Sequence, residues 1–155
     1  MRLNQILYTM KRILSLFLFA VICVASHAEW IETAETDFDV YYVNDNITKD
    51  ASGYYMVWVK QVPKTNVLAK RRNEYYRKYK KRKYLKYTHT IDLEKIDIYN
   101  NRVKCVTITD YASKESIDTV NTEYVTDWEY PIPDSAEDSI MIMAKAIIAY
   151  QENDY

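Results

Sequence analysis

The sequence has little cysteine, histidine, glycine or proline, and these shortages exclude several kinds of chemistry. Among 155 residues there are two cysteines, two histidines, one glycine and three prolines. A single glycine cannot build a glycine-rich phosphate-binding loop. So few cysteines and histidines cannot form a zinc site of ordinary ligand spacing. We therefore expect no catalytic residues, no metal ligands and no cofactor, and we interpret the protein as a non-enzyme.

The single histidine beyond residue 28, His89, limits nucleophilic catalysis in particular. Any nucleophile–histidine pair would have to use it. The alternating pattern around His89 favours a partly buried structural role instead. Paired carboxylates could still hydrolyse glycosides, although no particular pair stands out. This hydrolase alternative requires a concave pocket that holds two close carboxylates.

The first 28 residues have the pattern of a secretory signal peptide. Three basic residues and no acid precede an apolar run at 13–24, and Ser26 and Ala28 place small residues at −3 and −1 of a cleavage site. The apolar run is too short to span a bilayer. We therefore expect cleavage after Ala28, one domain at 29–155, and no membrane span after cleavage. The protein would then be exported to the periplasm or to the cell surface.

Export leaves Cys105 as the only cysteine, because Cys23 lies within the signal peptide. A single cysteine cannot form an internal disulfide. Two interpretations of Cys105 stay open. Its place in an alternating strand pattern favours a buried, inert thiol, whereas an export compartment also permits an intermolecular disulfide that would make a dimer.

The pattern of apolar and turn-forming residues predicts an α+β fold. We expect a single antiparallel sheet of about six strands, because the connections are too short for crossovers. The expected strands are 30–36, 39–43, 54–62, 87–99, 102–111 and 116–125. Asn100-Asn101 predicts a two-residue turn. Both faces of 54–62 are largely apolar, so we expect this strand to be covered on both sides.

Two helices complete the expected fold. Residues 66–84 contain no glycine or proline and are rich in helix-forming residues, which predicts a basic mid-chain helix. Asp134 and Glu137 have the spacing of a capping box at the start of a C-terminal helix. The apolar stripe that follows predicts that this helix packs on the sheet.

Charge is strongly segregated along the chain. Residues 60–86 hold twelve of the 18 basic residues found after residue 28 and only one acid, for a net charge of +11. Residues 29–59 have a net charge of −6, and residues 87–155 one of −9. The basic segment could fold against the acidic body and be neutralised there by ion pairs. Alternatively, it could bind an anionic partner.

The second interpretation assigns the candidate binding residues. Basic side chains would attract the ligand, and tyrosines would provide contact area. The candidates are Arg71, Arg72, Tyr75, Tyr76, Arg77, Lys78, Tyr79, Lys80, Lys81, Arg82 and Lys83. Export argues against nucleic acid as the partner and favours a host matrix protein or a sulfated glycan.

Several short motifs resemble a known family. They are Glu29-Trp30-Ile31, Val40-Tyr41-Tyr42-Val43, Val57-Trp58-Val59-Lys60, Leu93-Glu94-Lys95-Ile96-Asp97 and Trp128-Glu129-Tyr130-Pro131-Ile132-Pro133-Asp134-Ser135. Over about 29–149 the chain resembles the surface-adhesin protein E-like family of small exported bacterial proteins. The resemblance implies a small antiparallel sheet with a packed helix and, for some members, adhesion to host extracellular-matrix and serum proteins.

The chain departs from this family pattern at two cysteines. The family places one cysteine directly after the Ile-Asp of its fourth strand, where this chain has Ile98, and another in the final helix, which has none here near 144–146. We expect an exported, non-enzymatic binding protein, with adhesion implied by the resemblance. The alternative is a periplasmic structural or accessory protein whose basic segment has no ligand.

Overall fold

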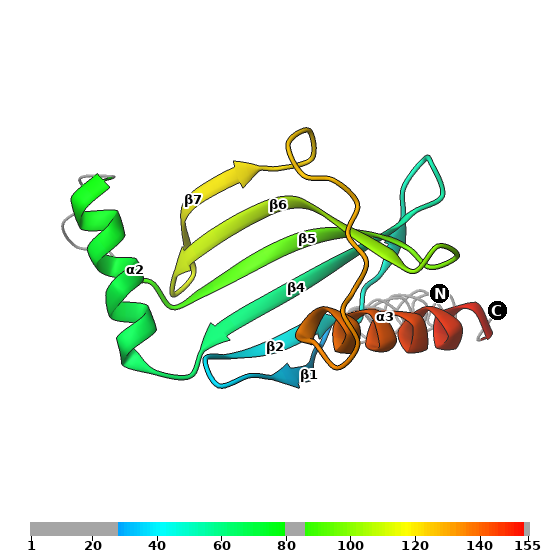
Figure 1. Ribbon diagram of the computed structural model, residues 1–155, viewed down its shortest axis with the longest axis horizontal. Coiled ribbons are helices and arrows are strands. Elements are labelled where there is room, and N and C mark those ends of the chain that lie inside the picture. The colour runs from blue at the N-terminus through cyan, green and yellow to red at the C-terminus, as the bar shows by residue number, and fades with distance from the viewer. Residues whose placement is uncertain (1–27, 80–85, 154–155) are drawn as a thin grey trace, which may run out of the picture.

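One antiparallel sheet and two helices make up the part of the chain that the structure, a computed structural model, describes: residues 28–79 and 86–153 (Figure 1). The elements are β1 (Trp30–Glu35), β2 (Asp39–Asn44), β3 (Thr48–Lys49), β4 (Tyr55–Pro63), α2 (Asn66–Tyr79), β5 (His89–Asp97), β6 (Arg102–Ala112), β7 (Glu115–Asn121) and α3 (Ala136–Asn153). The strand order is β1-β2-β4-β5-β6-β7, and β3 adds to β4 outside this path. The expected α+β class is confirmed.

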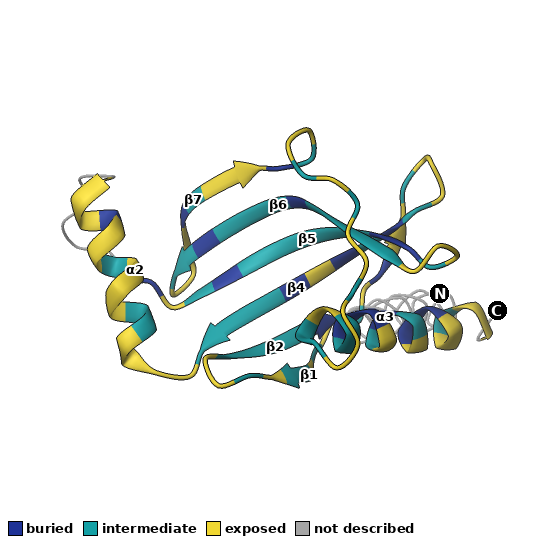
Figure 2. Ribbon diagram, in the orientation of Figure 1, coloured by how far each residue is buried: buried dark blue, intermediate teal, exposed yellow. Residues whose placement is uncertain are grey.

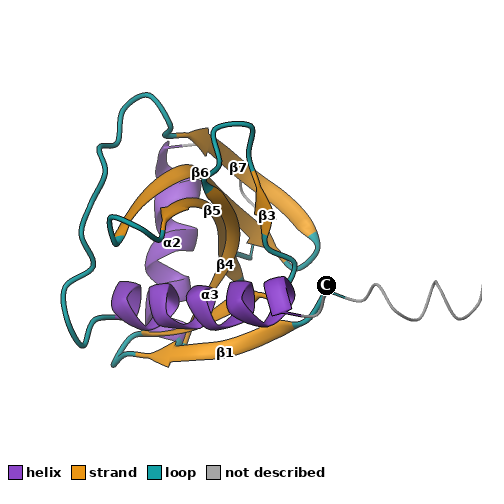
Figure 3. Ribbon diagram, turned by 90° about the vertical axis from the view of Figure 1, so that its right-hand side faces the viewer, coloured by secondary structure: helices purple, strands orange, loops and turns teal. Residues whose placement is uncertain are grey.

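The two helices occupy different parts of a curved sheet. Figure 3 shows α3 lying inside the curve above β1, and Figure 1 shows α2 at the end of the sheet farthest from the C-terminus of α3. The segment between β7 and α3 passes the free part of β6, where the backbone groups of Val103 and Glu129 form two hydrogen bonds of 2.8 and 2.9 Å. These bonds pair backbone groups of β6 that the shorter β7 leaves unpaired at this edge of the sheet.

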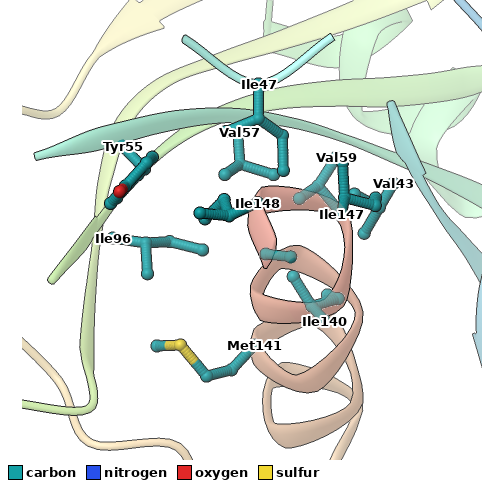
Figure 4. Close-up of a cluster of buried hydrophobic side chains, with 11 residues drawn as sticks. Val43, Ile47, Tyr55, Val57, Val59, Ile96, Ile140, Met141, Ile147 and Ile148 are labelled. Carbon is teal, nitrogen blue, oxygen red and sulfur yellow. The ribbon is translucent and has the colours of Figure 1, made fainter. Parts of the chain in front are cut away.

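The main hydrophobic core lies between α3 and the sheet (Figure 4). Its sheet side consists of apolar residues from β2, β4 and β5, and its helix side consists of the apolar stripe of α3. The central members are Val43, Val57, Val59, Ile96, Ile140, Met141, Ala144, Ile147 and Ile148. Each large apolar side chain contributes roughly 1.5–3 kcal/mol when fully buried. The expected packing of the C-terminal helix on the sheet is confirmed.

The expectation that β4 is covered on both sides is wrong. Val57 and Val59 face α3, but Trp58 on the opposite face keeps 40% of its surface exposed. On that open face the Lys60 ammonium lies 4.6 Å from the ring centre of Trp30, and it also contacts Tyr42. Aromatic side chains on this face pack around a cation. In the sequence, such a strand has the same apolar pattern as a strand that a second layer of structure covers.

Three local boundaries also differ from the expectations. The β5–β6 loop has four residues, with Asn101 at φ +52°, and the carboxylate of Asp97 accepts hydrogen bonds from Asn100. Strand β7 ends at Asn121, because the chain then turns toward β6. Helix α3 is capped by Ser135, whose hydroxyl accepts from the Asp138 amide at 3.2 Å. Asp134 has φ +64°, whereas an N-cap residue needs an extended backbone.

Candidate functional site

The sheet face that bears the core becomes polar toward α2. Directly paired residues of antiparallel strands point to the same face. Val59 pairs with Asp92, Gln61 pairs with Thr90, and Thr90 pairs with Asp110. The face that is hydrophobic beneath α3 therefore continues as a surface of carboxyl, amide and hydroxyl groups in front of α2.

Asp110 on β6 attaches α2 to this polar surface. The residue is 4% exposed, and its carboxylate accepts hydrogen bonds from the hydroxyls of Tyr76 and Thr90, the latter at 2.6 Å. Arg72 donates to it as well, from Nε at 3.0 Å and from Nη2 at 3.4 Å. Burial, and then the neighbouring Asp110 carboxylate, raise the pKa of Tyr76. Four donor groups thus converge on one buried acid.

Two further contacts fix the position of α2. The side-chain oxygen of Asn73 accepts from the Tyr87 amide at 2.7 Å, which ties the helix to the segment that leads into β5. Tyr76, Tyr87 and Ile117 form a small apolar cluster beneath the helix. Tyr76 is the only fully buried residue of α2, and Figure 2 shows most of the helix exposed.

The outward surface of α2 is cationic and aromatic. Lys70, Arg71, Arg77 and Lys78 are exposed, and none of them forms an ion pair with another described residue. Tyr79 is 62% exposed, and the Lys78 ammonium lies 5.0 Å from its ring centre. We call these four basic residues, together with Tyr75 and Tyr79, the outer face of α2.

The structure divides the predicted binding residues into three groups. Arg72 and Tyr76 turn inward to Asp110. Those on the outer face are Arg71, Tyr75, Arg77, Lys78 and Tyr79. Lys80, Lys81, Arg82 and Lys83 lie outside the described residues. The basic segment is therefore neither wholly free nor wholly neutralised, because within its described part only Arg72 and Lys64 pair with an acid.

A groove of about 340 Å³ lies beside the outer face, between α2 and the sheet. Its lining residues are Asp39, Gln61, Pro63, Leu68, Arg71, Arg72, Tyr75, Tyr87 and Thr90. A second hollow, of about 220 Å³, lies toward β6 and β7 and shares Arg72 and Tyr75 with the groove. The groove combines cations, one carboxylate, an amide and aromatic rings, so it can offer both hydrogen-bond donors and acceptors.

Two partly buried carboxyls on β5 were not anticipated. Burial, reinforced by the charge of Asp110, raises the pKa of Asp92 to about 7. Burial and the neighbouring Asp92 and Glu137 raise the pKa of Glu94 to about 8. Within the described residues, the Oδ1 atom of Asp92 is buried without a hydrogen-bond partner. Neither acid lines the groove or the second hollow. The alternation of β5 indicates that both acids share one face of the strand with Ile96. Only the pairing of β5 with β4 shows that this face is the one toward α3 and α2.

The remaining candidate groups have local contacts. His89 stacks in parallel on Tyr111 at 5.0 Å, and its Nδ1 lies 2.9 Å from the Thr88 hydroxyl. Cys105 is partly buried, its thiol approaches the carbonyl of Thr107 at 3.8 Å, and burial raises its pKa. Dimerisation through this thiol stays a prediction.

Within residues 28–79 and 86–153, no group of three histidine, cysteine or acidic side chains is arranged to hold a metal ion. Neither described helix has the length and hydrophobicity needed to cross a membrane. Comparison with protein-family models, curated proteins and solved structures gave no match. The resemblance to the surface-adhesin protein E-like family therefore stays a prediction from the sequence.

Proposed function

We propose that this is an exported, non-enzymatic binding protein that uses the outer face of α2 to hold an anionic ligand, such as a sulfated glycan or an acidic region of a host matrix protein. One observation carries the proposal. The helix places four basic side chains on an exposed surface without acidic partners among the described residues. Clustered positive charge raises the local concentration of anions and speeds their association.

The way in which α2 is attached supports this proposal. Arg72, Tyr76 and Asn73 hold the helix to the body of the protein, while the outer face is left available. A ligand-binding surface built on a fixed helix loses less conformational entropy on binding than one built on a flexible segment. Arg71 and Arg77 on the outer face can each make a bidentate contact with a sulfate or carboxylate group.

The start of the fold is compatible with export. Ala28 and Glu29 are exposed, and β1 begins only at Trp30. The backbone nitrogen of Glu29 lies 2.7 Å from Oδ1 of Asp45. Cleavage after Ala28 would turn this nitrogen into a charged amino group beside a carboxylate, and a charged donor makes a stronger hydrogen bond than a neutral amide.

The proposal is tested by binding of the purified protein to immobilised heparin and to a panel of matrix proteins, at about 50 and 300 mM salt, a range over which screening increases markedly. The key variant reverses two charges on the outer face, Arg77→Glu with Lys78→Glu. We expect salt-sensitive binding by the unmodified protein and at least a roughly tenfold loss in the variant, which is equivalent to about 1.4 kcal/mol.

A matched control reverses two charges away from α2, Lys104→Glu on β6 with Lys145→Glu on α3. It changes the net charge equally but leaves α2 intact, so we expect affinity within about threefold of the unmodified protein. Equal losses of affinity in both variants would mean that binding depends on the net charge of the protein and not on the outer face of α2. Unchanged binding in the α2 variant, or no binding at either salt concentration, would favour the accessory protein without a ligand at its basic segment.

A further inference from the structure

The groove beside α2 contains polar groups whose hydrogen-bonding capacity the protein does not use. Arg71 has no acidic partner among the described residues, and no hydrogen bond within the described part of the chain reaches the carboxylate of Asp39. Gln61 donates from Nε2 to the Tyr41 hydroxyl at 3.2 Å, and its Oε1 is not engaged by a described donor. The groove therefore offers a cationic donor, an anionic acceptor and an amide acceptor.

This combination selects for a particular ligand chemistry. Arg71 at one side favours an anionic group, because it has no acidic partner among the described residues, whereas Arg72 is already paired with Asp110. Asp39 in the same lining repels a uniformly anionic ligand, and its carboxylate can only accept hydrogen bonds. A ligand that satisfies both sides must carry an acid and, a short distance away, hydroxyl donors. Inorganic polyphosphate meets only the first requirement.

The apolar part of the lining restricts the shape of the ligand. Leu68 and the rings of Tyr75 and Tyr87 contribute apolar surface to the same groove, and the Arg72 guanidinium lies 5.8 Å from the ring centre of Tyr87. Aromatic faces accept the apolar face of a flat ring, while polar groups at the rim fix its orientation. A volume of about 340 Å³ is at the lower end for small-molecule sites, which suits one ring rather than an extended chain.

We propose that the groove between α2 and the sheet binds one hydroxylated, acid-bearing sugar unit, with Arg71 contacting its carboxylate or sulfate and Asp39 and Gln61 accepting from its hydroxyls. This inference rests on the proposed function in one respect, because it makes the groove the selective subsite of the anionic glycan that the outer face attracts. The outer face would then provide charge attraction that does not depend on ligand type, and the groove would provide the preference for sugar.

The first experiment uses small probes, so that it does not depend on the outer-face residues away from the groove, Lys70, Arg77, Lys78 and Tyr79. The purified, isotope-labelled protein is titrated with glucuronate, with glucose and with acetate while the side-chain amide of Gln61 and the methyl groups of Leu68 are followed by NMR. We expect saturable shifts with glucuronate and at least about fivefold weaker binding of glucose and acetate, because each lacks one half of the recognised chemistry. Equal binding of acetate and glucuronate, or no shift with glucuronate, would overturn the inference.

The second experiment compares two polymers of similar charge, heparin oligosaccharide and inorganic polyphosphate. Asp39→Asn preserves the shape of a groove residue but replaces one of its two acceptor oxygens with a donor NH2 group and makes the other a weaker, neutral acceptor. We expect this loss of hydroxyl recognition to outweigh the lost repulsion and to weaken binding of the oligosaccharide about three- to tenfold. Binding of polyphosphate should be unchanged or slightly stronger. Asp37→Asn is the matched control, since Asp37 is exposed in the bend just before β2 and does not line the groove.

The two experiments separate the failure of this inference from the failure of the proposed function. Glucuronate binding at Gln61 without polymer binding would overturn the role of the outer face and leave the groove assignment intact. Salt-sensitive polymer binding without glucuronate shifts, and with Asp39→Asn indistinguishable from Asp37→Asn, would overturn the groove assignment alone.

Discussion

The two helices pack on the same face of the sheet by different means. Helix α3 covers β1, β2 and β4 with an apolar stripe, and Met141 and Ala144 at its centre are no more than 1% exposed. Helix α2 has one fully buried side chain, Tyr76, and is held mainly by the hydrogen bonds that converge on Asp110. Apolar burial is strong and non-directional, whereas hydrogen bonds contribute modestly and fix orientation.

This difference indicates a division of roles between the helices. The fold depends on α3, so its sequence is constrained by packing. Helix α2 is positioned by a few polar contacts, which leaves most of its surface available for charge. Binding residues are commonly placed on elements that a rigid scaffold positions without depending on them for stability. The following predictions test whether stability and surface charge are separated in this way.

The largest effect is expected from Met141→Ala on α3. Met141 is 1% exposed within the main core, and truncating such a side chain removes buried contacts and leaves a cavity. We expect a loss of about 2–5 kcal/mol in the free energy of unfolding, measured by chemical denaturation.

The neighbouring residue provides the control for Met141. Ile142 is 61% exposed on the same helix, so Ile142→Ala should change the free energy of unfolding by no more than about 0.5 kcal/mol. Similar losses in both variants would mean that α3 contributes through its helical structure and not through the stripe that faces the sheet.

The second effect is expected from Asp110→Asn. The substitution removes the charge that accepts from Arg72 and Tyr76, so we expect a loss of about 2 kcal/mol, in the range for hydrogen bonds to charged groups. The loss should be concentrated in α2 and should appear as faster tryptic cleavage after its basic residues. Trypsin should cleave Glu74→Gln, which changes an exposed acid of the same helix, at the same rate as the unmodified protein.

Much of this architecture could be predicted from the sequence, because it follows from local patterns. The alternation of 54–62 and 102–111 predicted β4 and β6, and the stripe that includes Ile140 and Ile147 predicted the packing of α3. Both depend on burial of apolar side chains, which leaves a periodic signal in the chain.

The candidate site was less accessible to such reasoning. A run of basic residues predicted a charged helix, but not that Arg72 would turn inward to Asp110, 38 residues later. The partnership depends on the register between β5 and β6 and on the position of α2 against them. Asp39, Gln61 and Leu68 come together in the groove from three elements for the same reason. Contacts between distant segments have no periodic signature in one sequence.

The third effect concerns pH and the partly buried acids of β5. The pKa values of Asp92 and Glu94 are raised in the folded protein, to about 7 and about 8, so the folded state holds more protons than the unfolded state between about pH 4 and those values. Stability should therefore fall as pH rises from 5 to 8, by at most about 1.4 kcal/mol per pH unit for each group.

Glu94→Gln provides the corresponding variant. It removes one of the two titrating groups, so we expect the variant to lose part of this pH dependence and to be about 1 kcal/mol more stable than the unmodified protein at pH 8. At pH 4 the two proteins should be nearly equally stable, because the glutamic acid is then protonated. Equal stability at pH 8 would show that solvent reaches Glu94 and that burial does not raise its pKa.

The smallest effect is expected on the outer face of α2, where Lys70→Ala should change the free energy of unfolding by no more than about 0.5 kcal/mol. Lys70 is exposed and forms no ion pair with a described residue, and alanine favours the helix at least as strongly as lysine does. Chemical denaturation of this variant and of Asp110→Asn compares how much the exposed side and the inward side of α2 contribute to stability. A loss comparable to that of Asp110→Asn would mean that the exposed charges help to hold α2 in place. The basic residues of the outer face would then be explained by their contribution to stability, and their lack of acidic partners among the described residues would no longer indicate a ligand.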